Sequence, residues 1–202
     1  IISNSNFTKK LAVNLNLNEE KIIVINPGIE KNVVPTKENI QIANELFNNS
    51  FPKLITVSRF DKRKNHEKVI MTIRNLKEKF PNIKYLCIGY GVEESNLRKL
   101  VKQLKIEDAV IFKKNISPNL KSAFLLQSDL FIMPSIIHEK SVEGFGISFI
   151  EAAQQGTASI GGKDGGASDA IMHEETGLIC DGNDLNSIYE SILKILENDK
   201  YK

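Results

Sequence analysis

Short apolar segments alternate with amphipathic segments along most of the chain, and this alternation restricts the fold more than any other feature. The segments at 53–58, 83–88, 109–112 and 129–133 are rich in Val, Ile, Leu and Phe, which is typical of buried strands. Segments with helical periodicity separate them. Strands that are apolar on both faces and joined by helices form a parallel sheet covered on both sides. We therefore predict an α/β fold with a doubly wound, Rossmann-like parallel sheet.

Turn and capping residues set the other boundaries. Pro81-Asn82 ends a helix over 67–80, and Ser117-Pro118 is the N-cap and first-turn proline of a helix that runs to Gln127. The segment 161–166 is predicted to be a flexible glycine loop. The remaining predicted elements are strands at 22–25, 158–160 and 178–180, and helices at 37–48, around 97–104, and at 146–155, 167–173 and 184–198.

Composition excludes several classes of protein. The 202 residues are 41% hydrophobic and 26% charged with a formal charge of +2, which fits one globular domain, or one with a small appendage. The balanced charge predicts no nucleic acid polymer as a partner. Cys87 and Cys180 lie in apolar runs, so we predict reduced core residues of a cytoplasmic protein. No apolar stretch approaches the roughly 20 residues that span a bilayer.

The two ends predict a piece of a longer polypeptide. The chain begins at Ile1 without an initiator Met or a signal peptide, and it stops shortly after a helical pattern.

Functional residues are expected just after the strands, because doubly wound sheets bind ligands beyond the carboxyl ends of their strands. Arg59 and Lys64 follow the strand at 53–58, and a planar guanidinium fork with a compact ammonium suits a diphosphate. The alternative is a solvated basic turn that includes Lys62 and Arg63.

The second strand end carries Gly89-x-Gly91, the beginning of a dinucleotide fingerprint. Position 94 is Glu, so the third glycine is missing and a tight strand-to-helix turn is favoured. The same departure argues against an NAD-dependent dehydrogenase.

The richest strand end is Glu143-Gly144-Phe145-Gly146-Ile147, which opens a helix that contains Glu151. Glycines at a helix start let backbone N–H groups approach an anion closely. Glu151 shares its helix with several apolar residues, and a carboxylate held there suits a vicinal diol such as a ribose. The alternative is an ordinary surface Glu with a second carboxylate near the helix N-terminus. A third glycine turn, Gly165-Gly166, offers a further anion or sugar contact.

Taken in order, these motifs resemble the carboxyl-terminal, donor-binding domain of the family 4 retaining glycosyltransferases (glycosyl transferases group 1), which have the GT-B fold. The resemblance is strong from Phe51 to Asn198. It is carried by Ser58-Arg59 with Lys64-Asn65-His66, Ile88-Gly89-Tyr90-Gly91, Val110 to Ile116, Asp129 to Ser135, the Glu143 and Glu151 pair, Gly165-Gly166 and Thr176 to Ile179.

The resemblance implies roles for individual residues. Arg59 and Lys64 would bind the diphosphate of a nucleoside-diphosphate sugar, and Glu151 would hold the ribose hydroxyls. Glu143 and the amides of Gly144, Phe145, Gly146 and Ile147 would contact the transferred sugar and the phosphate. Ile116 would meet the base through its main chain, with Lys121 as a weaker candidate. The resemblance implies no metal and no cofactor, and His66, His138 and His173 are too scattered in the sequence to suggest a metal site.

Two segments depart from the family pattern. The link from 136 to 142 is longer than usual, which leaves the detailed sugar contacts open. Asp169 stands near the place of a family Glu after Gly165-Gly166, either as its substitute or as a residue that faces solvent.

The resemblance divides the chain into a remnant of the acceptor domain with the linker, at 1–34, and a nucleotide-sugar-binding domain at 35–202. It implies transfer of a hexose-type sugar to a glycan or lipid acceptor, as in polysaccharide biosynthesis, by a cytoplasmic enzyme that can associate peripherally with the inner face of the membrane. The piece itself is expected to bind its nucleotide weakly and to transfer nothing. The alternatives are a GT-B nucleotide-sugar epimerase and a non-catalytic sugar-nucleotide-binding module.

Overall fold

A six-stranded parallel sheet organises the computed structural model, which describes residues 1–30 and 33–198. The strands are β3 (Lys53–Val57), β4 (Lys84–Ile88), β5 (Val110–Lys113), β6 (Leu130–Met133), β7 (Ser159–Gly162) and β8 (Gly177–Cys180). They lie in the order β5-β4-β3-β6-β7-β8, and each runs parallel to its neighbours. The predicted doubly wound α/β fold is confirmed.

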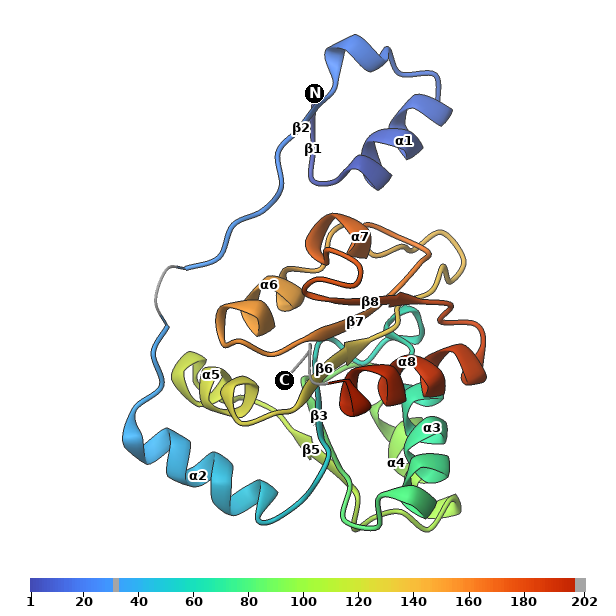
Figure 1. The fold of residues 1–202 in the computed structure, drawn as a ribbon. Coiled ribbons are helices and arrows are strands. Elements are labelled where there is room, and N and C mark those ends of the chain that lie inside the picture. The colour runs from blue at the N-terminus through green and yellow to red at the C-terminus, as the bar shows by residue number, and fades with distance from the viewer. Residues whose placement is uncertain (31–32, 199–202) are drawn as a thin grey trace.

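Helices cover both faces of this sheet (Figure 1). The helices α3 (His66–Lys79), α4 (Glu94–Gln103) and α8 (Leu185–Glu197) pack on one face, and α2 (Lys37–Phe47), α5 (Pro118–Leu126), α6 (Ile147–Gln154) and the short α7 (Ala167–Ala170) pack on the other. Neighbouring strand residues point to opposite faces. Leu54 therefore joins the core under α3, whereas Ile55 joins the core under α5.

The strand order reverses between β3 and β6. The chain runs outward from β3 to β4 and β5, then returns to β6 on the other side of β3. Two residue pairs, Leu54 with Leu130 and Ile55 with Phe131, join these strands. The segments that follow Val57 and Met133 therefore emerge side by side, at the point where doubly wound sheets form their ligand crevice.

Gly89 lets the turn after β4 pass close to the turn after β3. Its φ is +149°, and an added Cβ would lie 1.9 Å from the backbone oxygen of Ser58. We expect Gly89→Ala to lower the free energy of unfolding by about 2–4 kcal/mol, because overpacking and an unfavourable φ add together. Urea denaturation measures this effect. Gly156→Ala is the control, because its φ of +77° is also unfavourable but no atom lies within 4 Å of the added Cβ.

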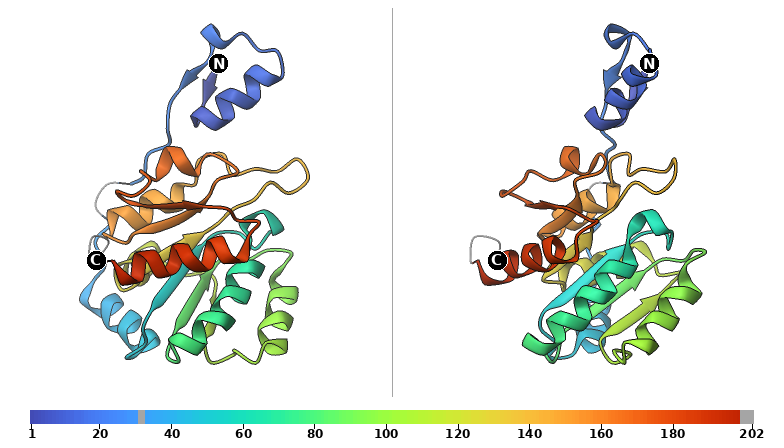
Figure 2. Two further views of the ribbon diagram at one scale, coloured as in Figure 1. Left: turned by 45° about the vertical axis from the view of Figure 1, so that its right-hand side comes forward. Right: turned by 90° about the vertical axis from the view of Figure 1, so that its right-hand side faces the viewer.

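The first residues form a small unit of their own, which lies beyond α7 (Figure 2). Its elements are β1 (Ile2–Ser3), α1 (Asn6–Asn14), a 3-10 helix η1 (Glu19–Lys21) and β2 (Ile23–Val24), and β1 pairs with β2 in a separate parallel sheet. Ser5 caps α1. The backbone N–H and the side-chain amide of Asn6 each donate to Asp169 Oδ2 at 2.8 Å, so Asp169 anchors this unit. The domain division at residue 34 stays a prediction.

Two predicted boundaries are wrong. Strand β7 extends through Gly161 and Gly162, which were predicted to lie in a flexible loop, and α7 ends at Ala170 rather than 173. Gly162 pairs with Cys180, and an added Cβ would lie 2.0 Å from the backbone oxygen of Ser135. The glycines therefore serve a close approach of backbones within the sheet.

Both cysteines are free and buried, as predicted, and burial raises the pKa of the Cys180 thiol to about 12. Among the described residues, none of the helices has the length and apolar character needed to cross a membrane.

Candidate functional site

A buried ionic cluster lies at the switch point between β3 and β6. Lys64 Nζ and Arg63 Nη1 both donate to Glu143 Oε2, the latter at 3.0 Å. Ser135 Oγ lies 3.4 Å from the same oxygen. The three charged residues are only 7–8% exposed. Two predicted site residues, Lys64 and Glu143, are thus brought together from segments 79 residues apart.

Local geometry around Asn65 positions the two cations. They end a 3-10 helix, η2 (Lys62–Lys64), that Asp61 caps by accepting from the Lys64 N–H at 3.2 Å. Asn65 then adopts a left-handed conformation, which asparagine tolerates well. Its amide donates to the backbone oxygens of Pro134 at 2.9 Å and Gly182 at 2.7 Å. This side chain fastens the turn after β3 to the loops that follow β6 and β8.

The start of α6 lies beside this cluster. Gly146 is its N-cap at φ +92°, where a Cβ would lie 2.5 Å from the Phe149 ring. The backbone oxygen of Glu143 accepts from Gly166 N–H at 2.8 Å, so the third glycine turn supports the segment that carries Glu143. The predicted arrangement of a carboxylate, a glycine-rich turn and a helix N-terminus is present.

The two predicted phosphate ligands differ in exposure, because Lys64 is buried and Arg59 is exposed. Desolvation lowers the pKa of the Lys64 ammonium, and the Glu143 carboxylate opposes that shift. Arg59 has a side chain that is 70% exposed and pairs with Asp61 at 3.4 Å. The alternative of a solvated basic turn is therefore wrong for Lys64 and Arg63. Sequence reasoning missed Arg63, because a run of basic residues gives no sign of which one is buried.

The predicted ribose and base residues lie together on the α5–α6 side. Lys121 Nζ on α5 donates to Glu151 Oε1 on α6 at 2.6 Å, and each side chain is about one-quarter exposed. Both line a pocket of about 170 Å³ with Pro118, Leu125 and Val33. Ile116, just before α5, packs against the core on this face.

The buried His66 belongs to a chain of hydrogen bonds that begins at Ser58, next to Arg59 in the sequence. Its Nε2 lies 3.0 Å from Ser58 Oγ, and its Nδ1 lies 3.1 Å from Tyr85 Oη, which lies 2.8 Å from Thr56 Oγ1. Thr56 donates to the backbone oxygen of Ile132. A carbonyl only accepts, so Thr56 accepts from Tyr85, and Tyr85 in turn accepts from Nδ1–H of His66. Ser58 Oγ also donates to the backbone oxygen of Arg59 at 3.2 Å. Burial lowers the pKa of His66 to about 3, so the ring is neutral.

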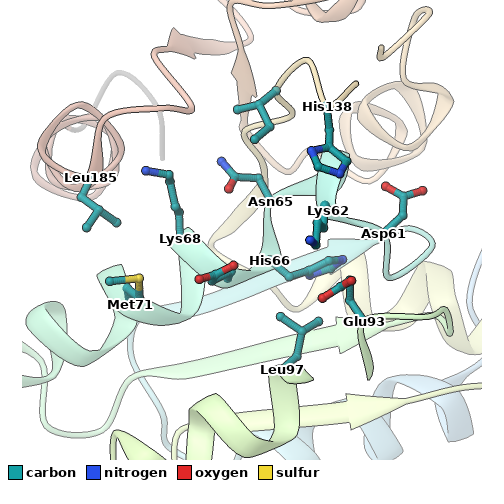
Figure 3. Close-up of a pocket in the computed structure, with 12 residues that line it drawn as sticks. Asp61, Lys62, Asn65, His66, Lys68, Met71, Glu93, Leu97, His138 and Leu185 are labelled. Atoms are coloured by element: carbon teal, nitrogen blue, oxygen red, sulfur yellow. The ribbon is translucent and has the colours of Figure 1, made fainter. Parts of the chain in front are cut away.

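A larger pocket, of about 380 Å³, lies beside the turn after β3 and the start of α3 (Figure 3). It is lined by the segment from Asp61 to Met71, by the start of α4 and by the link after β6, which contributes Ile136 and His138. Its charged side chains include Asp61, Lys68 and Glu93, so they have both signs (Figure 3). The unusual link at 136–142 thus forms one wall of a pocket. Within residues 1–30 and 33–198, no three His, Cys, Asp or Glu side chains gather as a metal site would need.

The parallel sheet, its switch point and the adjacent glycine-rich helix start define a Rossmann-like domain that suits a phosphate-bearing ligand. Comparison with known proteins gives the family. The family model described as Glycosyl transferases group 1 matches residues 37–202. The chain belongs to this family.

Individual relatives share modest sequence identity with this chain. The chain is 27% identical over 147 residues to a GDP-mannose-dependent alpha-(1-6)-phosphatidylinositol monomannoside mannosyltransferase of Mycobacterium tuberculosis, covering 72% of this chain and 38% of that protein. It is 31% identical over 150 residues to an N-acetyl-alpha-D-glucosaminyl L-malate synthase of Bacillus anthracis, covering 73% and 36%. The chain therefore matches little more than a third of the length of these relatives.

Solved structures share the fold over nearly the whole chain. Anabaena HepE in complex with UDP and glucose superposes with a TM-score of 0.85 at 20% identity, covering 99% of this chain and 54% of that one. The carboxyl-terminal domain of a glycosyl transferase group 1 protein from Francisella tularensis gives 0.71 at 20% identity, covering 86% and 90%. The fold is that of one Rossmann-like domain of a GT-B protein.

Proposed function

We propose that this chain is the donor-binding part of a retaining glycosyltransferase that transfers a hexose-type sugar from a nucleoside-diphosphate sugar to a glycan or lipid acceptor. The observation that carries the proposal is the buried pairing of Lys64 with Glu143 beside the glycine-rich start of α6, at the switch point. Family membership supports it, as does the GDP-mannose dependence of the mycobacterial relative.

The diphosphate binds where positive charge converges. Within the described residues, no side chain caps the N-terminus of α6, so its first N–H groups are available to a ligand, and its dipole favours an anion. Lys64 lies beside it, and the exposed Arg59 closes over the ligand from solvent. As the sugar leaves the nucleotide, negative charge grows on the diphosphate, and these fixed cations and dipoles stabilise it.

The other groups orient the donor. Glu151 accepts hydrogen bonds from the ribose hydroxyls, and Lys121 holds that carboxylate in place. The base lies against the main chain at Ile116. Glu143 and the amides from Gly144 to Ile147 contact the sugar, and no metal or organic cofactor takes part. The reaction transfers the sugar with retention at its anomeric carbon.

The acceptor lies outside the residues that this domain provides. We propose that a second domain of the whole enzyme supplies the acceptor site, and that this chain alone binds nucleotide without transferring sugar. A lipid-linked acceptor would bring the enzyme to the cytoplasmic face of a membrane as a peripheral protein.

Calorimetric titration of the chain with UDP, GDP and ADP tests the proposal. Binding of at least one of them is expected, with a matching rise in melting temperature, because a ligand that binds only the folded state stabilises it. Folded protein that binds none of the three would contradict the proposal, and so would hydrolysis or transfer by this chain with a donor sugar alone.

Replacing the ribose ligand should weaken this binding. We expect Glu151→Ala to cost about 1–3 kcal/mol of nucleotide binding free energy, the range for a hydrogen bond to a charged group. Glu45→Ala is the control, because Glu45 also lies on a helix and accepts a side-chain hydrogen bond, from Gln41 at 2.9 Å. Equal affinities of the Glu151 variant and wild type would remove Glu151 from the site.

A further inference from the structure

The ionic cluster holds more positive than negative charge. Arg63 and Lys64 share one oxygen of Glu143, and all three residues are buried. Asp61 adds only a longer contact, at 3.8 Å from Arg63, and it also pairs with Arg59. Buried cations need compensating negative charge, so one more anionic group would balance the charge of this cluster.

The two cations differ in their freedom to move. The Arg63 guanidinium is held at Glu143 on one side and near Asp61 on the other, and its buried Nε makes no hydrogen bond within the described residues. Lys64 is a single ammonium on a flexible stem, and beyond Glu143 it contacts the weak acceptor Met133 Sδ at 3.4 Å. Lys64 is therefore the cation that can exchange partners.

We propose that Arg63 is a positioning residue that keeps Glu143 paired while Lys64 turns from this carboxylate to the donor's diphosphate. The inference rests on the proposed function and adds a residue to it. Without Arg63, the departure of Lys64 would leave a buried carboxylate with Ser135 as its remaining close partner, which is costly. With Arg63 in place, the exchange leaves both anions paired.

Arg63→Gln tests this role through the affinity for the nucleoside diphosphate that the wild-type chain binds. Lys64 then becomes the only cation on Glu143, and we expect the affinity to fall by about 10- to 100-fold, as for the loss of a charged hydrogen bond. In Arg63→Gln/Glu143→Gln, Lys64 has no carboxylate to hold it, and the affinity should return to within about threefold of wild type. Arg74→Gln is the matched control, since Arg74 pairs with Glu78 on the exposed face of α3.

Other results would contradict either the role of Arg63 or the proposed function. Unchanged affinity in Arg63→Gln overturns the inference. An equal loss in the single and double variants also overturns it, because Arg63 would then contact the ligand directly. If the wild type binds no nucleotide, the proposed function fails instead. Circular dichroism checks folding. If Arg63→Gln does not fold, the uncharged Arg63→Met takes its place in the same cycle, and failure of Arg63→Met/Glu143→Gln to exceed Arg63→Met in affinity counts against the proposal.

Discussion

Glu143→Gln is expected to lower the free energy of unfolding by about 3–5 kcal/mol, the usual cost of removing one partner from a buried ion pair. The substitution nearly preserves shape, but it removes the carboxylate that Lys64 and Arg63 share and leaves Arg63 with the longer contact to Asp61 at 3.8 Å. Urea denaturation at neutral pH measures the loss. Pyrophosphate should raise the melting temperature of this variant more than that of wild type, because the added anion replaces the missing charge.

An exposed glutamate provides the comparison for this effect. Glu78→Gln removes a partner from the Arg74 pair, whose side chains are 45% and 77% exposed, and exposed pairs contribute about 0–1 kcal/mol. A loss in Glu143→Gln as small as that in Glu78→Gln would show that the cluster does not stabilise the switch point.

His66 should make stability depend strongly on pH in the acid range. Its pKa in the folded protein is about 3, below the ordinary 6.5 of the unfolded chain. Between these values the unfolded state binds a proton that the folded state does not, so stability falls as the pH falls through this window. The free energy of unfolding is expected to change by about 1.4 kcal/mol per pH unit in this window. Above pH 6.5, His66 no longer makes stability depend on pH.

Denaturation curves between pH 4 and 7 for wild type and His66→Gln isolate this contribution. Because Asp129 also has a pKa raised by burial, the quantity to compare is the difference between the two proteins rather than either slope alone. Parallel curves for wild type and His66→Gln would contradict a neutral buried imidazole.

The sheet could be predicted from the sequence because each strand carries its own signal. Apolar runs such as 84–88 and 130–133 are bounded by Pro, Gly or polar turns, and both appear within a residue of their predicted limits. Strand β1 has two residues and gives no comparable signal. The extension of β7 through Gly161 and Gly162 depends on a neighbouring backbone, which a local pattern does not report.

The site was predictable in its residue types and less so in its contacts. The pairing of Glu151 with Lys121, and of Glu143 with Lys64, joins residues that had been singled out separately. The burial of Arg63 depends on an asparagine in a left-handed conformation and on a carboxylate 80 residues away. The uncharged state of His66 depends on its burial at the start of α3, against Tyr85 of β4 and the Phe60 ring. Both are properties of the assembled fold.

The short pairing between β3 and β6 has a mechanical consequence. Two residue pairs join these strands, whereas five join β3 to β4. The shortest pairing in the six-stranded sheet thus lies where its two halves meet, and the cluster of Glu143 with Lys64 and Arg63 links the segments that follow β3 and β6 there. An anion bound there would add contacts between the two halves. We therefore expect a pulling force to separate the sheet between β3 and β6 first, and a bound nucleotide to raise the force required.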